Sequence, residues 1–183
     1  MLLVASTREG EEAIVLDMLA HVDVPGLLTV IVPRHPQRFD EVERLLEARG
    51  LHFQRRSANA VVPGDTGVVL GDSMGEMFAY YAACDVAFIG GSLLPFGGHN
   101  LIEACAAGKP VLIGPHSYNF AEATELAVHA GAALQVPDAK ALAQEAGRLL
   151  RDPAAAQRMA LAALAFANAH RGATAKVIAL LKF

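Results

Sequence analysis

The hydrophobic positions of this chain form short apolar runs that alternate with stretches of helical spacing. Runs of Val, Leu and Ile without alternating polar residues are typical of strands buried on both faces of a parallel sheet. We expect such strands at residues 2–6, 27–32, 51–56, 68–70, 86–89 and 111–113. Helical patterns begin near residues 11 and 40 and cover residues 75–83, 99–107 and 120–130. This alternation, with short glycine-containing connections, predicts an α/β fold built on a doubly wound parallel sheet.

The chain from about residue 138 onward is rich in Ala, with Leu at helical spacing. Asp152-Pro153 interrupts this pattern, and proline suits the first turn of a new helix. Two or three helices packed on the sheet are therefore expected at the C-terminus. No internal repeat and no linker divides the sequence, so residues 1–183 are predicted to form one domain.

Composition limits the classes of function. The chain has 15 Lys and Arg against 19 Asp and Glu, a net charge of −4. Because proteins that coat nucleic acid are basic on one face, that class is excluded and any bound anion must be held locally. The hydrophobic share of 54% predicts a well-filled core. Cys84 and Cys105 lack the spacing of a metal site, and no apolar run approaches the roughly 18 residues of a membrane span, so a soluble chain in a reducing compartment is expected.

Ligands of doubly wound sheets bind beyond the carboxyl ends of the strands, where four loops carry candidate chemistry. The first loop, residues 6–12, has small residues that let a ligand approach its backbone. A capping box, in which Ser or Thr pairs with a Glu three residues on, explains the same residues equally well. This loop alone therefore does not decide between a binding site and a helix cap.

The second and third loops follow the next predicted strands. Residues 33–36 hold two prolines that stiffen the chain around Arg34 and His35, a pair that suits phosphate or carboxylate. A surface arginine in a proline-bounded turn is the slightly favoured alternative. In residues 71–77, glycines let the backbone read the edge of a base, although Met74 and Met77 are more typical of a core.

The fourth loop, residues 90–103, gives the strongest signal. Its glycine pairs open a helix whose first free N–H groups favour phosphate. Asn100 and Glu103 lie on one helical face, where a carboxylate can accept both hydroxyls of a ribose. The less favoured alternative is that the glycines only permit a tight turn and that Glu103 lies near the helix start because its charge interacts favourably with the helix dipole. The pattern is neither GxGxxG nor GxxxxGK[ST], so neither a nicotinamide cofactor nor an ATP-driven P-loop is indicated, and the chain also lacks HExxH and GxSxG.

Taken together, these motifs resemble the C-terminal half of 3-deoxy-D-manno-octulosonic acid (Kdo) transferases. The resemblance runs from about residue 6 to residue 136 and departs at Leu101-Ile102, where some relatives have Pro-Leu. It implies the GT-B fold, in which two Rossmann-like domains face each other across a cleft, and it makes this chain the C-terminal, donor-binding half. The motifs that carry it, in the family's order, are residues 32–39, 71–77, 90–92, 97–100 with Glu103, and 114–116.

The same resemblance implies that the chain binds the donor, CMP-Kdo. Arg34, beside His35, would meet the CMP phosphate or the Kdo carboxylate, and Glu103 would take the ribose. The turn at residues 97–100 would hold the phosphate, the segment 74–77 would lie against the cytosine, and the two serines would line the cleft. The donor-binding residues implied are Ser6, Arg34, His35, Met74, Gly75, Glu76, Met77, Ser92, Gly97, Gly98, His99, Asn100 and Glu103.

In this family, Kdo passes from CMP-Kdo to a lipid A precursor in lipopolysaccharide biosynthesis, with inversion and without a metal or other cofactor. The general base is a Glu of the N-terminal domain, which also binds the acceptor and associates with the cytoplasmic face of the Gram-negative inner membrane. The resemblance thus implies no catalytic residue in this chain, which would be inactive by itself. Two alternatives stay open: the donor-binding domain of another GT-B glycosyltransferase that uses a UDP-sugar, and a non-catalytic sugar-nucleotide-binding module.

Overall fold

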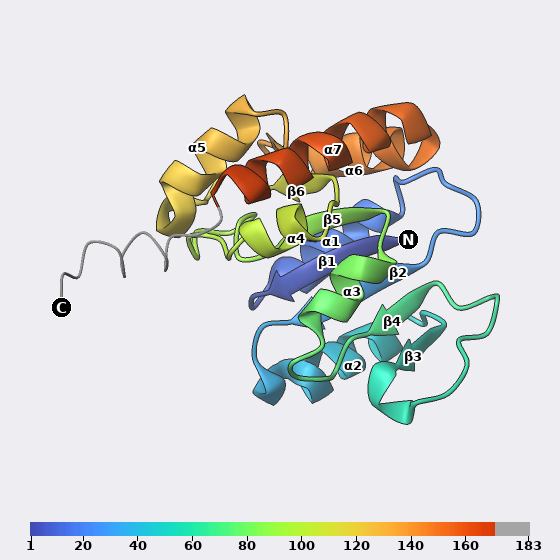
Figure 1. Ribbon diagram of the computed structural model, residues 1–183. Helices are drawn as coiled ribbons and strands as arrows, with labels where there is room; N and C mark the ends of the chain where they lie inside the picture. The colour runs from blue at the N-terminus through green and yellow to red at the C-terminus, as the bar shows by residue number, and fades with distance from the viewer. Residues whose placement is uncertain (171–183) are drawn as a thin grey trace, which may run out of the picture.

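The computed structural model describes residues 1–170, which form a seven-stranded parallel sheet with helices on both faces (Figure 1). The strand order is β3-β4-β2-β1-β5-β6-β7. This architecture confirms the α/β fold class and the doubly wound sheet. The strands are β1 (Leu2–Thr7), β2 (Thr29–Pro33), β3 (Phe53–Arg55), β4 (Val68–Leu70), β5 (Val86–Ile89), β6 (Val111–Ile113) and β7 (Ala133–Gln135).

The helices agree with the expected pattern except near the fourth loop. The helix expected at residues 99–107 is reduced to the five residues from Ile102 to Ala106. Gly97 and Gly98 take left-handed backbone angles, and the Asn100 side chain accepts the Ile102 N–H at the first residue of the helix. Residues 171–183 of the expected helical tail lie outside the described residues. The helices are α1 (Glu11–Leu19), α2 (Phe39–Ala48), α3 (Met77–Ala83), α4 (Ile102–Ala106), α5 (Ala121–His129), α6 (Ala139–Arg151) and α7 (Pro153–Ala169), with 3₁₀ turns at Pro36–Arg38, Arg56–Ala58 and Tyr118–Phe120.

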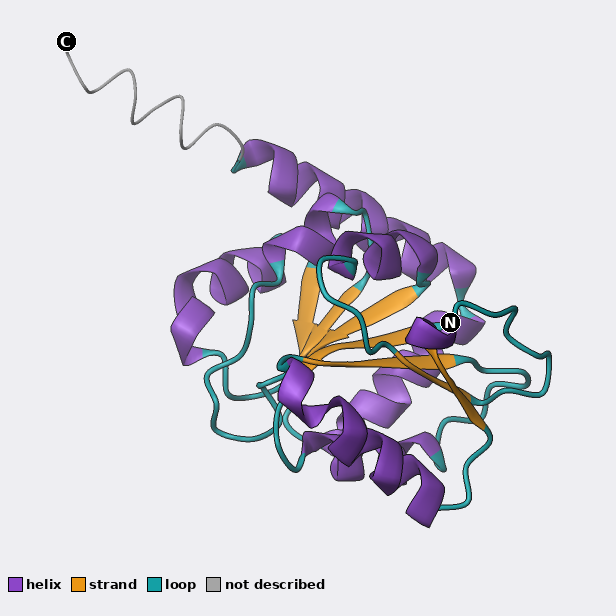
Figure 2. Cartoon of the chain, turned by 90° about the horizontal axis from the view of Figure 1, so that it is seen from below, coloured by secondary structure: helices purple, strands orange, loops and turns teal. Residues whose placement is uncertain are grey.

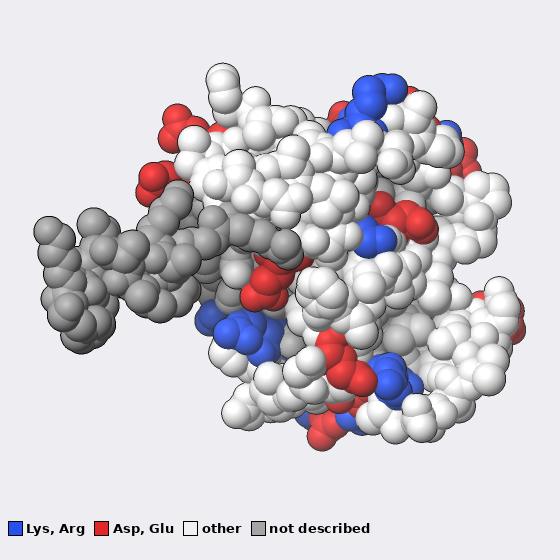
Figure 3. Space-filling view, viewed as in Figure 1, with Lys and Arg blue, Asp and Glu red and all other residues white. Residues whose placement is uncertain are grey.

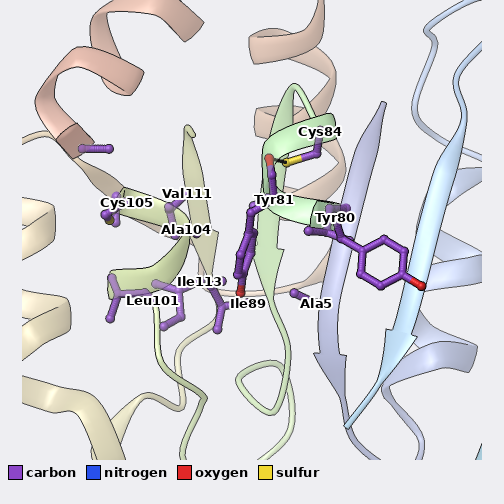
Figure 4. Close-up of a cluster of buried hydrophobic side chains, with 14 of the residues drawn as sticks. Ala5, Tyr80, Tyr81, Cys84, Ile89, Leu101, Ala104, Cys105, Val111 and Ile113 are labelled. Carbon is purple, nitrogen blue, oxygen red and sulfur yellow. Dashed lines mark hydrogen bonds between the residues drawn. The ribbon is translucent and has the colours of Figure 1, made fainter. Parts of the chain in front are cut away.

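The core has two layers, one on each face of the sheet, and Figure 2 shows the strands fanning between two groups of helices. Alternate residues of β1 enter opposite layers: Leu3 packs with α3, α4, α5 and α7, whereas Leu2 packs with α1, α2 and α6. Figure 4 shows part of the first layer, with Tyr81 of α3 and Ile89 of β5 among its labelled residues. Both cysteines are free thiols buried in this layer. Strands apolar on both faces therefore fill both layers, as the uninterrupted runs predict.

The sheet also fixes where a ligand can bind. Strands β2, β3 and β4 lie on one side of β1, while β5, β6 and β7 lie on the other. The helices after β1 and β5 therefore leave toward opposite faces, and in doubly wound folds ligands bind in the crevice between the carboxyl ends of two such strands. A hollow of about 480 Å³ opens at the opposite edge, where β2 and β4 begin, and is separate from this crevice. None of the helices in residues 1–170 has both the length and the apolar character that crossing a bilayer requires.

Candidate functional site

The four loops chosen from the sequence meet at the carboxyl edge of the sheet, joined by backbone hydrogen bonds. The Arg34 N–H donates to the carbonyl of Thr7 at 3.0 Å, which joins the second loop to the first. The Gly71 N–H donates to the carbonyl of Ile31 at 2.8 Å, which places the third loop beside the second strand. A Cβ on Gly90 would lie 2.7 Å from the Ser6 carbonyl oxygen, so glycine is needed where the fourth loop passes the first. The sheet thus brings the predicted loops together.

A buried carboxylate organises the fourth loop. Glu11 has no exposed surface and accepts the backbone N–H groups of Gly91 at 2.6 Å and of Ser92 and Leu93 at 2.9 Å each. It also accepts the N–H of Arg8 at 2.9 Å. Glu11 thus holds a loop that lies 80 residues away in the chain. The N–H groups after the first glycine pair are therefore occupied by the protein itself.

The neighbouring acid forms a buried ion pair. Glu12 is 1% exposed and binds Arg38 through two hydrogen bonds, at 2.5 and 3.1 Å, and accepts the Thr7 hydroxyl at 2.6 Å. Burial lowers the pKa of Arg38, but its hydrogen bonds and attraction to Glu12 and Glu41 outweigh this and raise the pKa above its ordinary value. The partner of Thr7 is five residues away, so the capping box is not formed. The ion pair instead docks the turn that follows Arg34 onto α1.

The two serines expected to line the cleft have different environments. Ser6 adopts a left-handed backbone, with φ of 59°, at an irregularity in the pairing of β1 with β2. Ser92 is wholly buried, and its hydroxyl donates to the Ile89 carbonyl at 2.5 Å and accepts the Gly114 N–H at 2.8 Å. The prediction that Ser92 faces the cleft is therefore wrong, because its hydroxyl joins the ends of β5 and β6.

A cluster of basic side chains lies at the crevice. The Nε2 atom of His99 is buried without a hydrogen-bond partner among residues 1–170. Burial, then the positive charges of Arg34, Arg8 and His35, lowers the pKa of His99 to about 4. His35 is exposed and begins the Pro36–Arg38 turn in extended conformation. Within the described part of the chain, no carboxylate pairs with Arg8 or Arg34, so this basic cluster can accept an anion.

The fourth loop also presents a carboxylate, four residues after His99 in the chain. Glu103 is exposed on α4, and its Oε1 accepts the Asn100 amide at 3.2 Å, while Asn100 Oδ1 accepts the Ile102 N–H at 3.0 Å. No cation pairs with Glu103 among residues 1–170. Burial, followed by the charge of Glu103, raises the pKa of Tyr81, which places Glu103 near α3. Figure 3 shows acidic and basic atoms next to each other on the side of the molecule where the strands end.

The turn before α4 offers fewer free N–H groups than the sequence suggests. Gly98 donates its N–H to the Gly91 carbonyl at 2.7 Å, and the Ile102 N–H is taken by Asn100. Because α4 has only five residues, its dipole is also small. The charge available to an anion at this turn therefore comes mainly from the side chains around His99. No three His, Cys, Asp or Glu side chains in residues 1–170 are grouped as a metal site.

The third loop divides into anchored and exposed residues. Met77 packs against the core, whereas Met74 is 60% exposed, so only one of the two methionines is core. Glu76 accepts a hydrogen bond from Arg56 at 3.0 Å, and Gly75 takes a φ of 79°. A neighbouring carboxylate, Asp72, anchors the whole loop. The loop therefore offers an exposed apolar side chain on a fixed backbone.

The anchor of this loop is a buried hydrogen-bond network. Asp72 accepts the Ser57 N–H at 2.8 Å, the Ser57 hydroxyl at 2.5 Å and the Arg55 Nε–H at 2.6 Å. Burial by itself raises the pKa of Asp72, but these hydrogen bonds and the Arg55 charge outweigh it and lower the pKa below the ordinary value. Asp72 is therefore ionised at neutral pH, and its carboxylate holds the loop to the end of β3.

Replacing Gly97 by alanine is expected to lower the free energy of unfolding by about 2–4 kcal/mol, through left-handed strain and overpacking. Gly97 has a φ of 90°, and a Cβ there would overlap the Asn119 amide and lie 2.6 Å from the Tyr118 ring. Gly131→Ala is the control, because Gly131 has a φ of 69° with open space around it, so only the strain of about 1–2 kcal/mol remains. Urea unfolding of both variants measures the difference, and equal losses would contradict the overlap.

Comparison with known proteins identifies the family. The family described as glycosyl transferases group 1 matches residues 48–165. The chain is 48% identical over 184 residues to the 3-deoxy-D-manno-octulosonic acid transferase of Bordetella pertussis, and 40% identical over 185 residues to that of Haemophilus influenzae. These matches cover 97% and 98% of this chain and 43% of each relative, so the chain spans less than half the length of these relatives.

Solved structures agree with this family. The crystal structure of the C-terminal CMP-Kdo binding domain of WaaA from Acinetobacter baumannii has a TM-score of 0.85 and 34% identity, over 90% of this chain and 87% of that one. The C-terminal domain of the group 1 glycosyl transferase LpcC from Francisella tularensis shares the fold, with a TM-score of 0.65 at 15% identity, over 94% and 86% of the two chains. The chain therefore belongs to the group 1 glycosyl transferases and is the counterpart of the C-terminal domain of a Kdo transferase.

Proposed function

We propose that this chain binds CMP-Kdo at the carboxyl edge of its sheet, as the donor-binding domain of a Kdo transferase. One observation carries the proposal: Glu103, a carboxylate with no cation partner in the described chain, lies on α4, four residues after His99, whose basic neighbours Arg8 and Arg34 have no acid partner there. A nucleotide has the complementary chemistry, because its ribose donates hydrogen bonds and its phosphate is an anion. The similarity to the CMP-Kdo binding domain of WaaA supports the identity of the base and the sugar.

Within this site, each part of the nucleotide has a proposed partner. The free oxygen of Glu103 accepts the ribose hydroxyls, and the exposed Met74 and its neighbours Gly75 and Glu76 lie against the cytosine. Arg34 holds the phosphate, together with the turn that carries His99. Because the pKa of His99 is about 4, its imidazole is neutral near pH 7 and the arginine supplies the charge. Met77, at the end of the same loop, is partly buried and packs against the core.

The chemistry proposed for this chain is binding and charge stabilisation. When the bond between Kdo and CMP breaks, negative charge grows on the leaving phosphate, and fixed positive groups beside it stabilise the transition state. We propose that the attacking lipid A precursor and the general base are held by the remainder of a longer protein, at the cytoplasmic face of the inner membrane. The proposal includes no metal or other cofactor, and it makes the 183-residue chain inactive in a transfer assay by itself.

Glu103→Ala is expected to weaken CMP binding by about 1.5–3 kcal/mol, because charge-assisted hydrogen bonds to the ribose are lost. Calorimetric titration of the purified chain with CMP measures this change, and titration with UDP separates the proposal from a UDP-sugar enzyme. Glu125→Ala is the matched control, because Glu125 is also exposed on a helix but lies on α5. Preference for UDP over CMP, or unchanged affinity in folded Glu103→Ala, would reject the proposal.

A further inference from the structure

The loop after β1 contains an arginine that has no place among the residues inferred from the sequence. The guanidinium carbon of Arg8 lies 4.8 Å from the ring centre of Phe96, which belongs to the loop before α4. Among residues 1–170, its side chain makes no hydrogen bond and no ion pair, whereas Arg38 and Arg55 are both bound by carboxylates. Stacking on a ring holds a guanidinium in place and leaves its N–H groups free for an anion.

The neighbours of Arg8 point to a second anion in the site. A Cβ on Gly91 would lie 3.0 Å from His99 Nε2 and 3.4 Å from Arg8 Cγ, so both side chains pack over this glycine. Arg34 and Arg8 both act on His99 through their charges, which places both guanidinium groups at the same crevice. Two cations without an acid between them repel each other, and bound anions relieve that repulsion.

The charges of the proposed donor match this pair. A sugar joined to CMP is held by a phosphodiester, which carries one negative charge, and an acidic sugar such as Kdo adds a carboxylate. Arg34 is already the proposed partner of the phosphate, and the guanidinium of Arg8, stacked on Phe96, presents a fork of donors that matches a planar carboxylate. Arg8 remains for the other anion. Resting on the proposed function, we infer that Arg8 binds the carboxylate of the donor sugar and so selects donors with an acidic sugar over donors with a neutral one.

The test compares CMP, which lacks the sugar carboxylate, with CMP-Kdo, which carries it. By calorimetric titration of the full chain, Arg8→Ala is expected to weaken CMP-Kdo binding about tenfold or more and CMP binding by less than about threefold. Arg8→Lys keeps the charge without the fork of donors and should fall between wild type and Arg8→Ala. Arg158→Ala is the control, because Arg158 is exposed on α7 and also lacks an acid partner in the described chain.

Folding does not limit this test, because only the backbone N–H of Arg8 bonds to Glu11 and every variant keeps it. Equal weakening of CMP and CMP-Kdo in Arg8→Ala would overturn the inference, since Arg8 would then bind the phosphate that both ligands share. Unchanged binding of both ligands would overturn it as well. Arg34→Ala should weaken both ligands. If the wild-type chain bound neither ligand, the proposed function itself would fail.

Discussion

Glu11→Ala is expected to lower the free energy of unfolding by about 3–5 kcal/mol, a large share of the stability of a domain of this size. The wild-type carboxylate accepts three consecutive N–H groups, from Gly91 to Leu93, in a place without solvent access. Alanine leaves these donors without an acceptor, and each buried donor that loses its partner costs about 1–3 kcal/mol. The loop that carries the second glycine pair then loses its attachment to α1.

Urea unfolding followed by circular dichroism measures this loss. Glu11→Gln keeps one acceptor oxygen but turns an amide N–H₂ toward N–H donors, so an intermediate loss of about 2 kcal/mol is expected. Glu9→Ala is the matched control, because Glu9 is exposed two residues away and should change stability by less than about 0.5 kcal/mol. A loss below about 1 kcal/mol in Glu11→Ala would show that water replaces the carboxylate.

Arg38→Ala is expected to cost about 3–5 kcal/mol, because it leaves Glu12 charged and buried. Glu12 is 1% exposed, and after the substitution the Thr7 hydroxyl is its only remaining donor among residues 1–170. Burial of an unpaired carboxylate is far more costly than exposure of an unpaired arginine. The same substitution frees the turn that follows Arg34, so the affinity for CMP should fall in the fraction that remains folded.

The control for this ion pair is Arg44→Ala, since Arg44 is exposed on α2 and, within the described part of the chain, bonds only to the Asp40 carbonyl. The double variant Glu12→Met with Arg38→Met removes both charges and fills the space with apolar atoms. Its stability should exceed that of Arg38→Ala, because no charge remains buried without a partner. If the double variant were as unstable as Arg38→Ala, lost packing and not the unpaired charge would be the cause.

Local patterns determined most of the fold. The strands β4, β5 and β6 begin and end where the apolar runs do, because each run is bounded by glycine, proline or a polar residue. Strand β7 was not predicted: Ala133–Gln135 has three residues, the last one polar and exposed, and such a segment has no periodicity to read. The shortened α4 follows from two consecutive glycines in left-handed conformation, which sequence spacing does not reveal.

The positions of the loops that form the candidate site were predictable, because the sheet topology determines them. Arg34 and Glu103 follow different strands, and a parallel sheet brings such positions to one edge whatever their separation in the chain. The role of Glu11 could not be predicted, because a carboxylate that faces solvent and one that binds a distant loop have the same local sequence. The same holds for the hydroxyl of Ser92, whose bond to the Ile89 carbonyl leaves no mark in the local sequence. Arg8 had one available signal, its place directly after the strand at the centre of the sheet.

The central place of β1 determines the order in which the chain can fold. Leu2 pairs with Thr29 on one side and with Val86 on the other, so the first strand of the chain gains its second neighbour only after β5 has been synthesised. Until then, β1 is an edge strand that is apolar on both faces, the kind of surface on which chains aggregate. Contacts between segments so far apart in sequence slow folding. Before β5 is synthesised, residues 1–85 therefore expose an edge on which chains can aggregate, and the loops at the carboxyl edge meet only when the second half of the sheet has docked.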